Sequence, residues 1–354
     1  MVVNSDKFNS GKPNIELWDL NLQKVVKRWD LTKSYKELIK LGEYEGNYFL
    51  HPLILKNNSI VFNTHVSGGG YLVKLDSDGE IKAINENYIF RHSINIDKSG
   101  LIYACIENKD NGKEGFAILD QDLKVINTFY IDDIYTKAKL EARLFSNKSD
   151  DPIHINDVQP LLSKGNLKSD IVFISLRSTS SILGFNLKEK RILWILDGFT
   201  SQQHDVDILD DDPFTISIFD NNISKINFSS NNKISIFSNL GKFNTIKKKD
   251  KILNIFIPNT ISFINSKIEI EEIDFKGLHK KYRPKTFNSG LSEYNPIENT
   301  FIVEESNFGR IFEYDYINGK RLWEYKNALD NEIFWRASWS RFYQENPLIN
   351  SQSI

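Results

Sequence analysis

Apolar and polar residues alternate with a period of two along most of the chain, in short runs separated by polar turns. Such alternation is typical of β-strands that bury one face. One pattern recurs six times: an alternating strand that ends in Asp or Asn, a short polar turn, and a second strand ending in a large apolar residue. The Asp or Asn opens a turn by bonding its own backbone, so each copy predicts a β-hairpin. The copies are residues 15–29, 71–84, 116–129, 182–194, 268–282 and 310–323.

Two further strand-like runs precede each of the later copies. The first run of each pair begins near His51, His92, His154, His204 and Ser289. The second runs are residues 59–63, 101–107, 171–176, 214–219 and 300–304. Radial packing of four-stranded sheets lets such a chain bury both faces of every sheet without long open edges. The sequence therefore predicts an all-β fold, a six-bladed β-propeller with four-stranded antiparallel blades.

The predicted domain organisation is a single propeller over residues 14–326, with a polar N-terminal extension over 1–13. The first copy lacks its leading strands, so either the N-terminal stretch or the C-terminal segment completes that blade, or the chain is short at its N-terminus. Residues of about 222–266 are expected to form an insertion in blade five, with extra strands near 252–257. Residues 327–354, which include Phe334, Trp335 and Trp339, are expected to cap the propeller. Short helices are expected near 34–41 and 133–145.

Composition narrows the possible partners. The net charge of −2 gives no global field toward nucleic acid or an anionic membrane. The single cysteine, Cys105, excludes an internal disulfide and a thiolate metal site, and its apolar surroundings predict a buried small hydrophobe. The first twelve residues have no apolar core of a signal peptide, and no apolar stretch approaches about 20 residues. The default expectation is a cytoplasmic protein, with compartment and oligomeric state left open.

Histidines supply the main candidate chemistry. Four of the six histidines, His51, His92, His154 and His204, stand at the start of the innermost strand of their repeat. Innermost strands line the central channel of a propeller, so these side chains are expected to converge at one channel mouth. Arg177 follows a second strand close to that mouth, and Asn156 shares a strand face with His154.

Two interpretations of these histidines remain open. Propeller blades often hold a structural histidine bonded to turn residues, and His51, followed by Pro52, fits that role. Four in register beside an arginine and an asparagine favour function, because desolvated polar groups need a reason to be there.

A metal site is the first chemical alternative. Several imidazoles could hold zinc or copper, with Asp157, Asp205 or Asp207 as further ligands. Arg177 at the same mouth disfavours a cation and favours an anionic substrate. The run of acids at 210–212 is interpreted as a polar turn rather than a calcium loop, and neither a phosphate-binding loop nor a Gly-x-Ser-x-Gly elbow is present. We expect neither a metal nor a cofactor.

With these residues identified, the sequence resembles the arylsulfate sulfotransferase (arylsulfotransferase) family. The likeness covers residues 14–326 and is densest over 152–222. The matching pieces are His154-Ile-Asn156, the strand 170–177 that ends in Arg177, Gln203-His204-Asp205, Phe219-Asp-Asn221, Gly309–Glu313 and Leu322–Tyr325. The resemblance implies a six-bladed propeller fold. It also implies an enzyme that transfers a sulfuryl group from an aryl sulfate to a phenol without a nucleotide donor.

The resemblance also assigns roles. It implies His204 as the histidine that is transiently sulfated, with His92, His154 and Arg177 as further catalytic residues. Asn156, Asn221 and Arg310 are expected to bind substrate. The expected partners are a small aryl sulfate donor and a phenolic acceptor, with no nucleic acid and no membrane. The alternatives are a non-catalytic binding propeller with structural histidines, and a metal- or quinone-dependent oxidoreductase, because the hairpin Gly319–Glu324 resembles tryptophan-docking repeats of quinoproteins.

Overall fold

The structure is a computed structural model. It describes residues 2–5, 14–20, 22–31, 34, 48–65, 70–145, 151–161, 170–198, 200–211, 214–221, 275–279, 282–284, 289–326, 339–343 and 346–348, with short strands and single residues between 223 and 286. Nearly all regular structure in these ranges is β-strand, as the alternation predicts.

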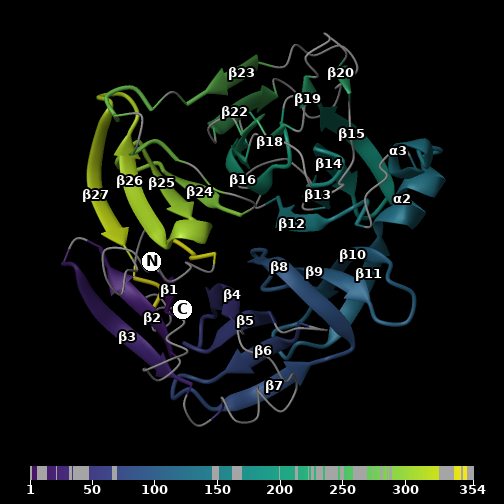
Figure 1. Cartoon of the computed structure of the whole chain (residues 1–354). Coiled ribbons are helices and arrows are strands. Elements are labelled where there is room, and N and C mark those ends of the chain that lie inside the picture. Colours follow the sequence, from purple (N-terminus) through teal and green to yellow (C-terminus); the bar gives the residue numbers. More distant parts are fainter. Residues whose placement is uncertain are drawn as a thin grey trace.

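Antiparallel four-stranded sheets are the repeating unit of the fold. The sheets follow one another around a ring in chain order, with the first strand of each nearest the centre (Figure 1). The two sheets after the first one are β4 (Tyr48–Ile54), β5 (Ile60–His65), β6 (Leu72–Leu75) and β7 (Ile81–Asn85), and then β8 (Tyr88–Ile96), β9 (Ile102–Asn108), β10 (Glu114–Leu119) and β11 (Val125–Tyr130). The protein is therefore a β-propeller with four-stranded antiparallel blades, as the repeat predicts.

Three more four-stranded sheets continue the ring. They are β12 (Ile155–Pro160), β13 (Ile171–Leu176), β14 (Ser181–Asn186) and β15 (Arg191–Asp197); β16 (His204–Asp211), β17 (Phe214–Asp220), β22 (Lys251–Ile257) and β23 (Glu269–Glu272); and β24 (Leu291–Asn295), β25 (Thr300–Glu305), β26 (Arg310–Asp315) and β27 (Lys320–Lys326). Helices α2 (Ile131–Lys137) and α3 (Ala142–Phe145) fall within or beside the predicted helical segment 133–145. Of the other predicted helix, only Ser34 is described, and it is helical.

The first sheet has three strands, β1 (Val2–Ser5), β2 (Asn14–Asp19) and β3 (Lys24–Asp30). Strand β1 pairs antiparallel with β2, so the N-terminal stretch contributes to this sheet. Trp18 of β2 packs on Tyr325 of β27 with ring centroids 5.9 Å apart. The first and last sheets thus meet, and the ring in Figure 1 closes between its purple and yellow ends.

The hairpin predicted over residues 268–282 is wrong. Strand β23 ends at Glu272 and is the outermost strand of its sheet, and residues 276–278 form a turn. The third strand is β22, which pairs with β17 on one side and β23 on the other. The alternating residues 252–257 therefore belong to the sheet itself. The connection before β22 carries the two-stranded pairs β18 (Ile223–Ser224) with β21 (Ile246–Lys247), and β19 (Asn227–Phe228) with β20 (Ile234–Ser235).

Aliphatic and aromatic side chains fill the space between neighbouring sheets. Phe116 of β10 stacks on Phe129 of β11 at 4.9 Å and meets Phe185 of β14 edge-on at 6.4 Å. Cys105 is fully buried in the same cluster, as its apolar context predicts. Across the described part of the chain, no helix is long and apolar enough to span a membrane.

Candidate functional site

The inner strands carry an irregularity that shapes the channel. Register shifts, typical of β-bulges, interrupt the pairing of β4, β8, β12 and β16, each at or next to one of the four histidines. Three of the four histidines have a left-handed backbone here, with φ of 50° at His51 and 49° at both His92 and His154. In β16 the left-handed residue is Asp205, at φ 60°, one position after His204. Bulges kink a strand and re-aim its side chains, which suits residues that must face an axis.

Side chains at these bulges accept hydrogen bonds from the inner strand of the next sheet. The bonds are Ile94 N to His51 Nδ1 (3.2 Å), Val158 N to Ser93 Oγ (3.3 Å), Val206 N to Asp157 Oδ2 (2.9 Å) and Ser292 N to Asp205 Oδ2 (2.9 Å). Burial, together with the charge of Arg341, keeps the pKa of His51 well below its usual range. His51 is therefore a neutral acceptor that joins two sheets, which is the structural role the sequence allowed for it. Asp205 has the same kind of role.

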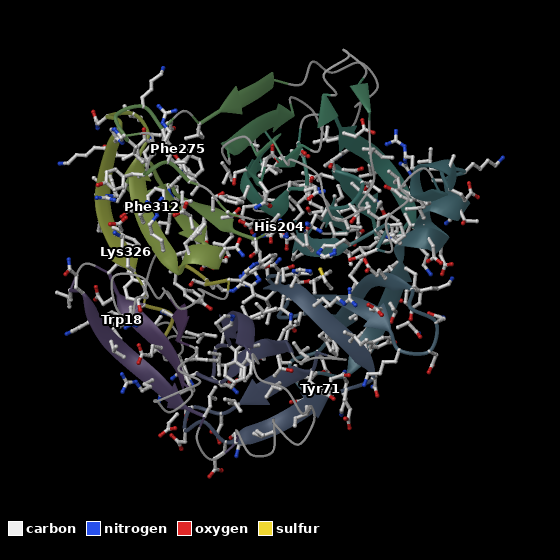
Figure 2. All side chains as sticks on the ribbon, viewed as in Figure 1. Trp18, Tyr71, His204, Phe275, Phe312 and Lys326 are labelled. Carbon is white, nitrogen blue, oxygen red and sulfur yellow. The ribbon has the colours of Figure 1, made fainter. Side chains whose placement is uncertain are left out.

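The other three histidines converge at the centre of the ring. The ring centroids of His92 and His154 lie 4.8 Å apart. The ring centroid of His204 lies 6.1 Å from that of His92 and 6.4 Å from that of His154. Figure 2 shows His204 near the middle of the molecule, where the inner strands meet. The convergence predicted from the repeat register therefore holds for His92, His154 and His204.

Trp339 closes one side of this histidine cluster. Its ring centroid lies 5.4 Å from that of His92, 5.8 Å from His204 and 6.0 Å from His51, and the side chain is buried. The buried carboxylate of Glu304 holds this segment, because it accepts hydrogen bonds from Trp339 N (2.9 Å) and Ser340 N (2.7 Å). Sequence reasoning placed Trp339 in a cap but not against the histidines.

His204 is held in a defined orientation. Its Nδ1 is hydrogen-bonded to Asn221 Oδ1, and Asn221 Nδ2 donates to Thr286 Oγ1 at 2.5 Å. With the amide oxygen facing the imidazole, Nδ1 carries the proton and Nε2 carries the lone pair. Burial lowers the pKa of His204 well below its usual range, and the charges of Arg177 and His154 lower it further. The imidazole is 1% exposed and neutral at physiological pH.

Asn156 and Gln203 fix the turn that leads into His204. Asn156 Nδ2 donates to the carbonyl of Gln203 at 2.8 Å, and both side chains are fully buried. Gln203 Nε2 donates to Leu176 O and Ser181 O, at 3.1 and 3.0 Å. Asn156 therefore lies beside His204 as predicted, but its amide already binds the backbone there. Its buried Oδ1 has no hydrogen-bond partner among the described residues.

Arg177 brings a positive charge to the same place. Its guanidinium donates to Oε1 of Gln202 at 3.2 Å, and Gln202 stands two residues before His204 in the chain. Burial lowers the pKa of Arg177, although a guanidinium stays charged at any physiological pH. Its Nε is buried and has no acceptor among the described residues. A desolvated guanidinium with an unused donor is suited to an anion such as a sulfate ester.

A family model described as Arylsulfotransferase (ASST) matches residues 51–328, which is well over half of the chain and includes every histidine of the cluster. The chain belongs to the arylsulfotransferase family. A search of curated proteins found no match.

Two solved structures share the fold of this arylsulfotransferase family member. A protein of unknown function from Bacteroides caccae aligns at a TM-score of 0.55 and 10% identity, covering 95% of this chain and 96% of its own. Hydrazine synthase from Kuenenia stuttgartiensis aligns at a TM-score of 0.51 and 10% identity, covering 86% and 70%. At such identities the likeness concerns the fold alone.

Arg310 makes its described contacts elsewhere. This side chain of β26 pairs with Glu305 and Glu324, donates to Tyr282 O at 2.9 Å, and lies over the ring of Phe312 at 4.7 Å. Two carboxylates already neutralise its charge. Among the described contacts, none joins Arg310 to the histidine cluster, in contrast to Asn221.

Sequence reasoning missed Asp151. Its Oδ2 is hydrogen-bonded to His154 Nδ1, so one histidine of the cluster has a carboxylate partner. The signal in the sequence was the short segment Asp151-Pro-Ile-His154, in which the carboxylate stands three residues before the histidine. Within the described ranges, no group of three or more His, Cys, Asp and Glu side chains has the geometry of a metal site.

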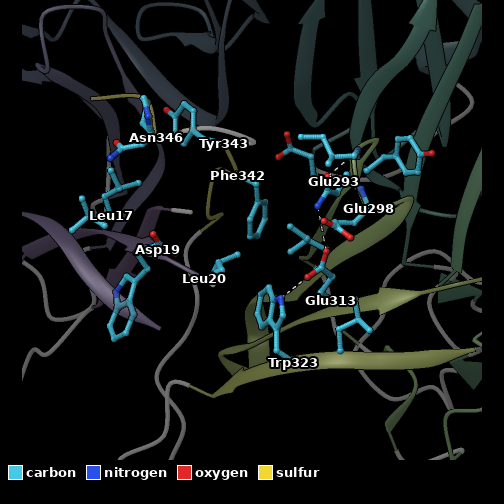
Figure 3. A pocket seen from close by; sticks show the side chains of 18 residues that line it. Leu17, Asp19, Leu20, Glu293, Glu298, Glu313, Trp323, Phe342, Tyr343 and Asn346 are labelled. Carbon is cyan, nitrogen blue, oxygen red and sulfur yellow. Dashed lines mark hydrogen bonds between the residues drawn. The ribbon is translucent and has the colours of Figure 1, made fainter. Parts of the chain in front are cut away.

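Two cavities border the described part of the propeller. One of about 560 Å³ lies between the first and last sheets, where Trp18, Trp323, Phe342 and Glu313 line it (Figure 3). The other, of about 200 Å³, lies beside His51 in the channel, and Asp205, Asp207, Glu293 and Arg341 line it. Neither cavity is lined by His204, so both are separate from the histidine cluster.

Proposed function

We propose that this member of the arylsulfotransferase family transfers a sulfuryl group from an aryl sulfate to a phenol, with His204 as the covalent nucleophile. The family acts on small aryl sulfates and phenols, and the resemblance in sequence implies His204, His92, His154, Asn156 and Arg177 as its site residues. The observation that carries the proposal is the convergence of His92 and His154 on the buried His204, beside a guanidinium with an unused donor.

In the first step, the lone pair on His204 Nε2 forms a bond to sulfur while the bond from sulfur to the aryl oxygen breaks. The aryl oxygen leaves with the bonding electron pair and takes a proton from a neighbouring acid. Nδ1 keeps its proton and donates it to Asn221 Oδ1, which stabilises the positive charge that develops on the sulfated imidazole. A neutral histidine is required for this attack, and the lowered pKa of His204 supplies it.

Arg177 is assigned to the sulfuryl oxygens. Its Nε–H can donate to oxygen as charge redistributes in the transition state, and in a water-poor site this donor is stronger than it would be in bulk water. Asn156 is assigned a positioning role through the Gln203 carbonyl, and its second N–H remains for a sulfuryl oxygen.

In the second step, the acceptor phenol loses its proton to a histidine and its oxygen attacks sulfur. The bond between sulfur and Nε2 breaks, and His204 returns to its neutral form. The burial of His204 favours transfer over hydrolysis, because water must be excluded from the sulfated imidazole.

The proposed fold has six blades. We infer that the three-stranded first sheet is the sixth blade, because it packs between its neighbours as the complete blades do. Six blades would agree with the fold that the family resemblance implies.

The direct test is a transfer assay with 4-nitrophenyl sulfate as donor and phenol as acceptor. Wild-type protein is expected to release nitrophenol and form phenyl sulfate, and His204→Ala is expected to do neither while remaining folded. A variant that loses several degrees of melting temperature but keeps the activity would assign His204 to structure instead. Wild-type protein without nitrophenol release would remove aryl sulfates from the substrate class.

A further inference from the structure

His154 has partners that the proposed mechanism has not yet used. Its side chain is 18% exposed, so this imidazole is more accessible than that of the buried His204. Asp151 Oδ2 binds its Nδ1. A carboxylate that accepts from Nδ1–H fixes the tautomer, so that Nε2 holds the lone pair and is free to exchange a proton with a substrate.

Behind Asp151 stands a second, more buried carboxyl group. Glu114, on β10 of the preceding sheet, is 7% exposed and its carboxyl group lies beside that of Asp151. Glu114 Oε2 also accepts from Ile155 N at 2.9 Å, and its Oε1 lies 3.5 Å from Arg91 Nη1. One carboxyl group therefore supports both the side-chain partner of His154 and the backbone directly after it.

We propose that Glu114, Asp151 and His154 form a proton relay, in which His154 is the general acid and base for the phenolic oxygens and the two carboxyl groups are its positioning residues. This inference rests on the proposed function, because it assigns the acid and base of that same reaction. It assigns the acid–base role to His154 and not to His92, although both imidazoles lie beside His204.

The proton balance of the relay is simple. In the second step, Nε2 of His154 takes the acceptor phenol's proton. The ring becomes an imidazolium, and its Nδ1–H remains hydrogen-bonded to the Asp151 carboxylate. In the first step, the same imidazolium gives the Nε2 proton to the departing aryl oxygen and returns to neutral. One donor–acceptor cycle leaves the enzyme unchanged and needs no further reactant.

The ionisation of the two carboxyl groups fits these roles. Burial raises the pKa of Asp151, but the hydrogen bond and charge of His154 outweigh it and the pKa lies at about 2. Burial raises the pKa of Glu114 to about 8, with the Asp151 charge adding to the effect. At neutral pH, Asp151 is thus a carboxylate and Glu114 a carboxylic acid that can donate to it. When the pKa values of two adjacent carboxyl groups are separated in this way, one group is charged and the other is neutral at the same pH.

The test varies the acidity of the phenol, because proton transfer matters most for a weakly acidic one. The sulfated enzyme is formed with 4-nitrophenyl sulfate and then mixed with phenol, whose pKa is near that of tyrosine at about 10, or with a dinitrophenol that is already ionised at neutral pH. Asp151→Asn is expected to slow transfer to phenol by about tenfold to a hundredfold. Transfer to the ionised phenol is expected to change by less than about threefold, because it has no proton to lose.

Two variants of Glu114 and one control variant complete this comparison. Glu114→Gln keeps hydrogen-bonding atoms at this position, because its amide can donate to Asp151 while its oxygen accepts from Ile155 N, and it is expected to slow transfer to phenol less than Glu114→Ala does. Glu114→Ala removes both bonds and is expected to behave like Asp151→Asn. Asp133→Asn makes the same change at an exposed aspartate that pairs with Lys113, and is expected to leave both rates unchanged.

A further readout does not depend on activity. In wild-type protein, the Nδ1 proton of His154 is expected to resonate far downfield and to disappear in Asp151→Asn. A loss of rate that is equal for both phenols, or a His154 that carries its proton on Nε2, would overturn the relay while leaving His204 as nucleophile. If wild-type enzyme forms no sulfated adduct, the proposed function fails and the relay fails with it.

Discussion

Asn221 accepts a hydrogen bond from His204 through Oδ1, and its own amide nitrogen donates to Thr286. These three fully buried side chains come from different parts of one sheet and the segment after it. The arrangement leaves a single nitrogen of His204, Nε2, with a lone pair for chemistry. The proposed sulfuryl transfer depends on this orientation.

Removing the amide oxygen should therefore impair the first step. Asn221→Ala is expected to slow nitrophenol release by about tenfold to a hundredfold, for the loss of one oriented hydrogen bond worth about 1–3 kcal/mol. Stopped-flow measurement of the nitrophenol burst checks this. Thr286→Val keeps the amide oxygen beside His204 and should give a smaller loss. Equal rates for Asn221→Ala and wild type would contradict the orienting role.

The pH dependence of the burst follows from the pKa of His204. Burial and the Arg177 charge lower this pKa, so the reactive neutral form persists below pH 6.5. The burst rate is expected to stay level as the pH falls through 6.5 and to decline only in more acidic buffer. Arg177→Gln removes the charge, so its normalised profile should decline at a higher pH than that of wild type. A wild-type midpoint at 6.5 or above would contradict the buried, neutral imidazole.

The Trp339 segment should depend on Glu304. Two backbone N–H groups, of Trp339 and Ser340, donate to this buried carboxylate. Glu304→Ala leaves both without an acceptor and is expected to cost about 2–5 kcal/mol of the free energy of unfolding. Thermal or urea unfolding measures the change, with the exposed Glu298→Ala as control. If the two variants are equally stable, the segment is not anchored as described.

Carboxyl groups lining the smaller cavity should make stability fall as the pH rises. Burial raises the pKa of Asp207 well above its usual value, and the charges of Asp205, Glu293 and Asp157 add to this while Arg341 opposes it. Burial likewise raises the pKa of Glu293 to about 7. The folded state therefore holds protons that the unfolded chain releases near pH 4. This contribution is complete below that pH and is lost as the pH rises toward and through the raised values.

Asp207→Asn tests this linkage. One extra proton on the folded state corresponds to about 1.4 kcal/mol per pH unit, so wild-type protein should melt at progressively lower temperature from pH 5 to pH 8. The asparagine variant carries no ionisable group at 207 and is expected to show a shallower decline. Parallel melting curves for the two proteins would show that Asp207 ionises normally.

Much of the fold was accessible from the sequence because period-two alternation and the Asp or Asn turns mark individual strands. The prediction failed at residues 268–282. A long connection separates β17 from the third strand, β22, and the next alternating run was therefore taken as the third strand although it forms the fourth, β23. Alternation identifies a strand but does not specify its partner. The strand near 252–257 was visible in the pattern, yet only the pairing with Phe214–Asp220 assigns it to the sheet.

The candidate site was predicted in part for a related reason. His92, His154 and His204 could be placed together because the repeat puts each of them at the same position of its inner strand. The same logic included His51, which instead bonds the next sheet. Trp339 and Glu114 were not found, since Trp339 meets the histidines from the C-terminal segment and Glu114 lies beside Asp151 from another sheet. Asp151 is close to His154 in the sequence, yet only the folded backbone brings its carboxylate to the imidazole. Such contacts depend on three-dimensional packing that strand periodicity does not encode.

The central claim is that His204 is covalently sulfated, and intact-mass spectrometry tests it most directly. Wild-type protein, mixed with 4-nitrophenyl sulfate and quenched at alkaline pH, is expected to gain the mass of one sulfuryl group as one equivalent of nitrophenol appears. Peptide mapping should assign the adduct to His204, and His204→Ala should gain no mass. Nitrophenol release without an adduct, or an adduct that persists in His204→Ala, would contradict the mechanism.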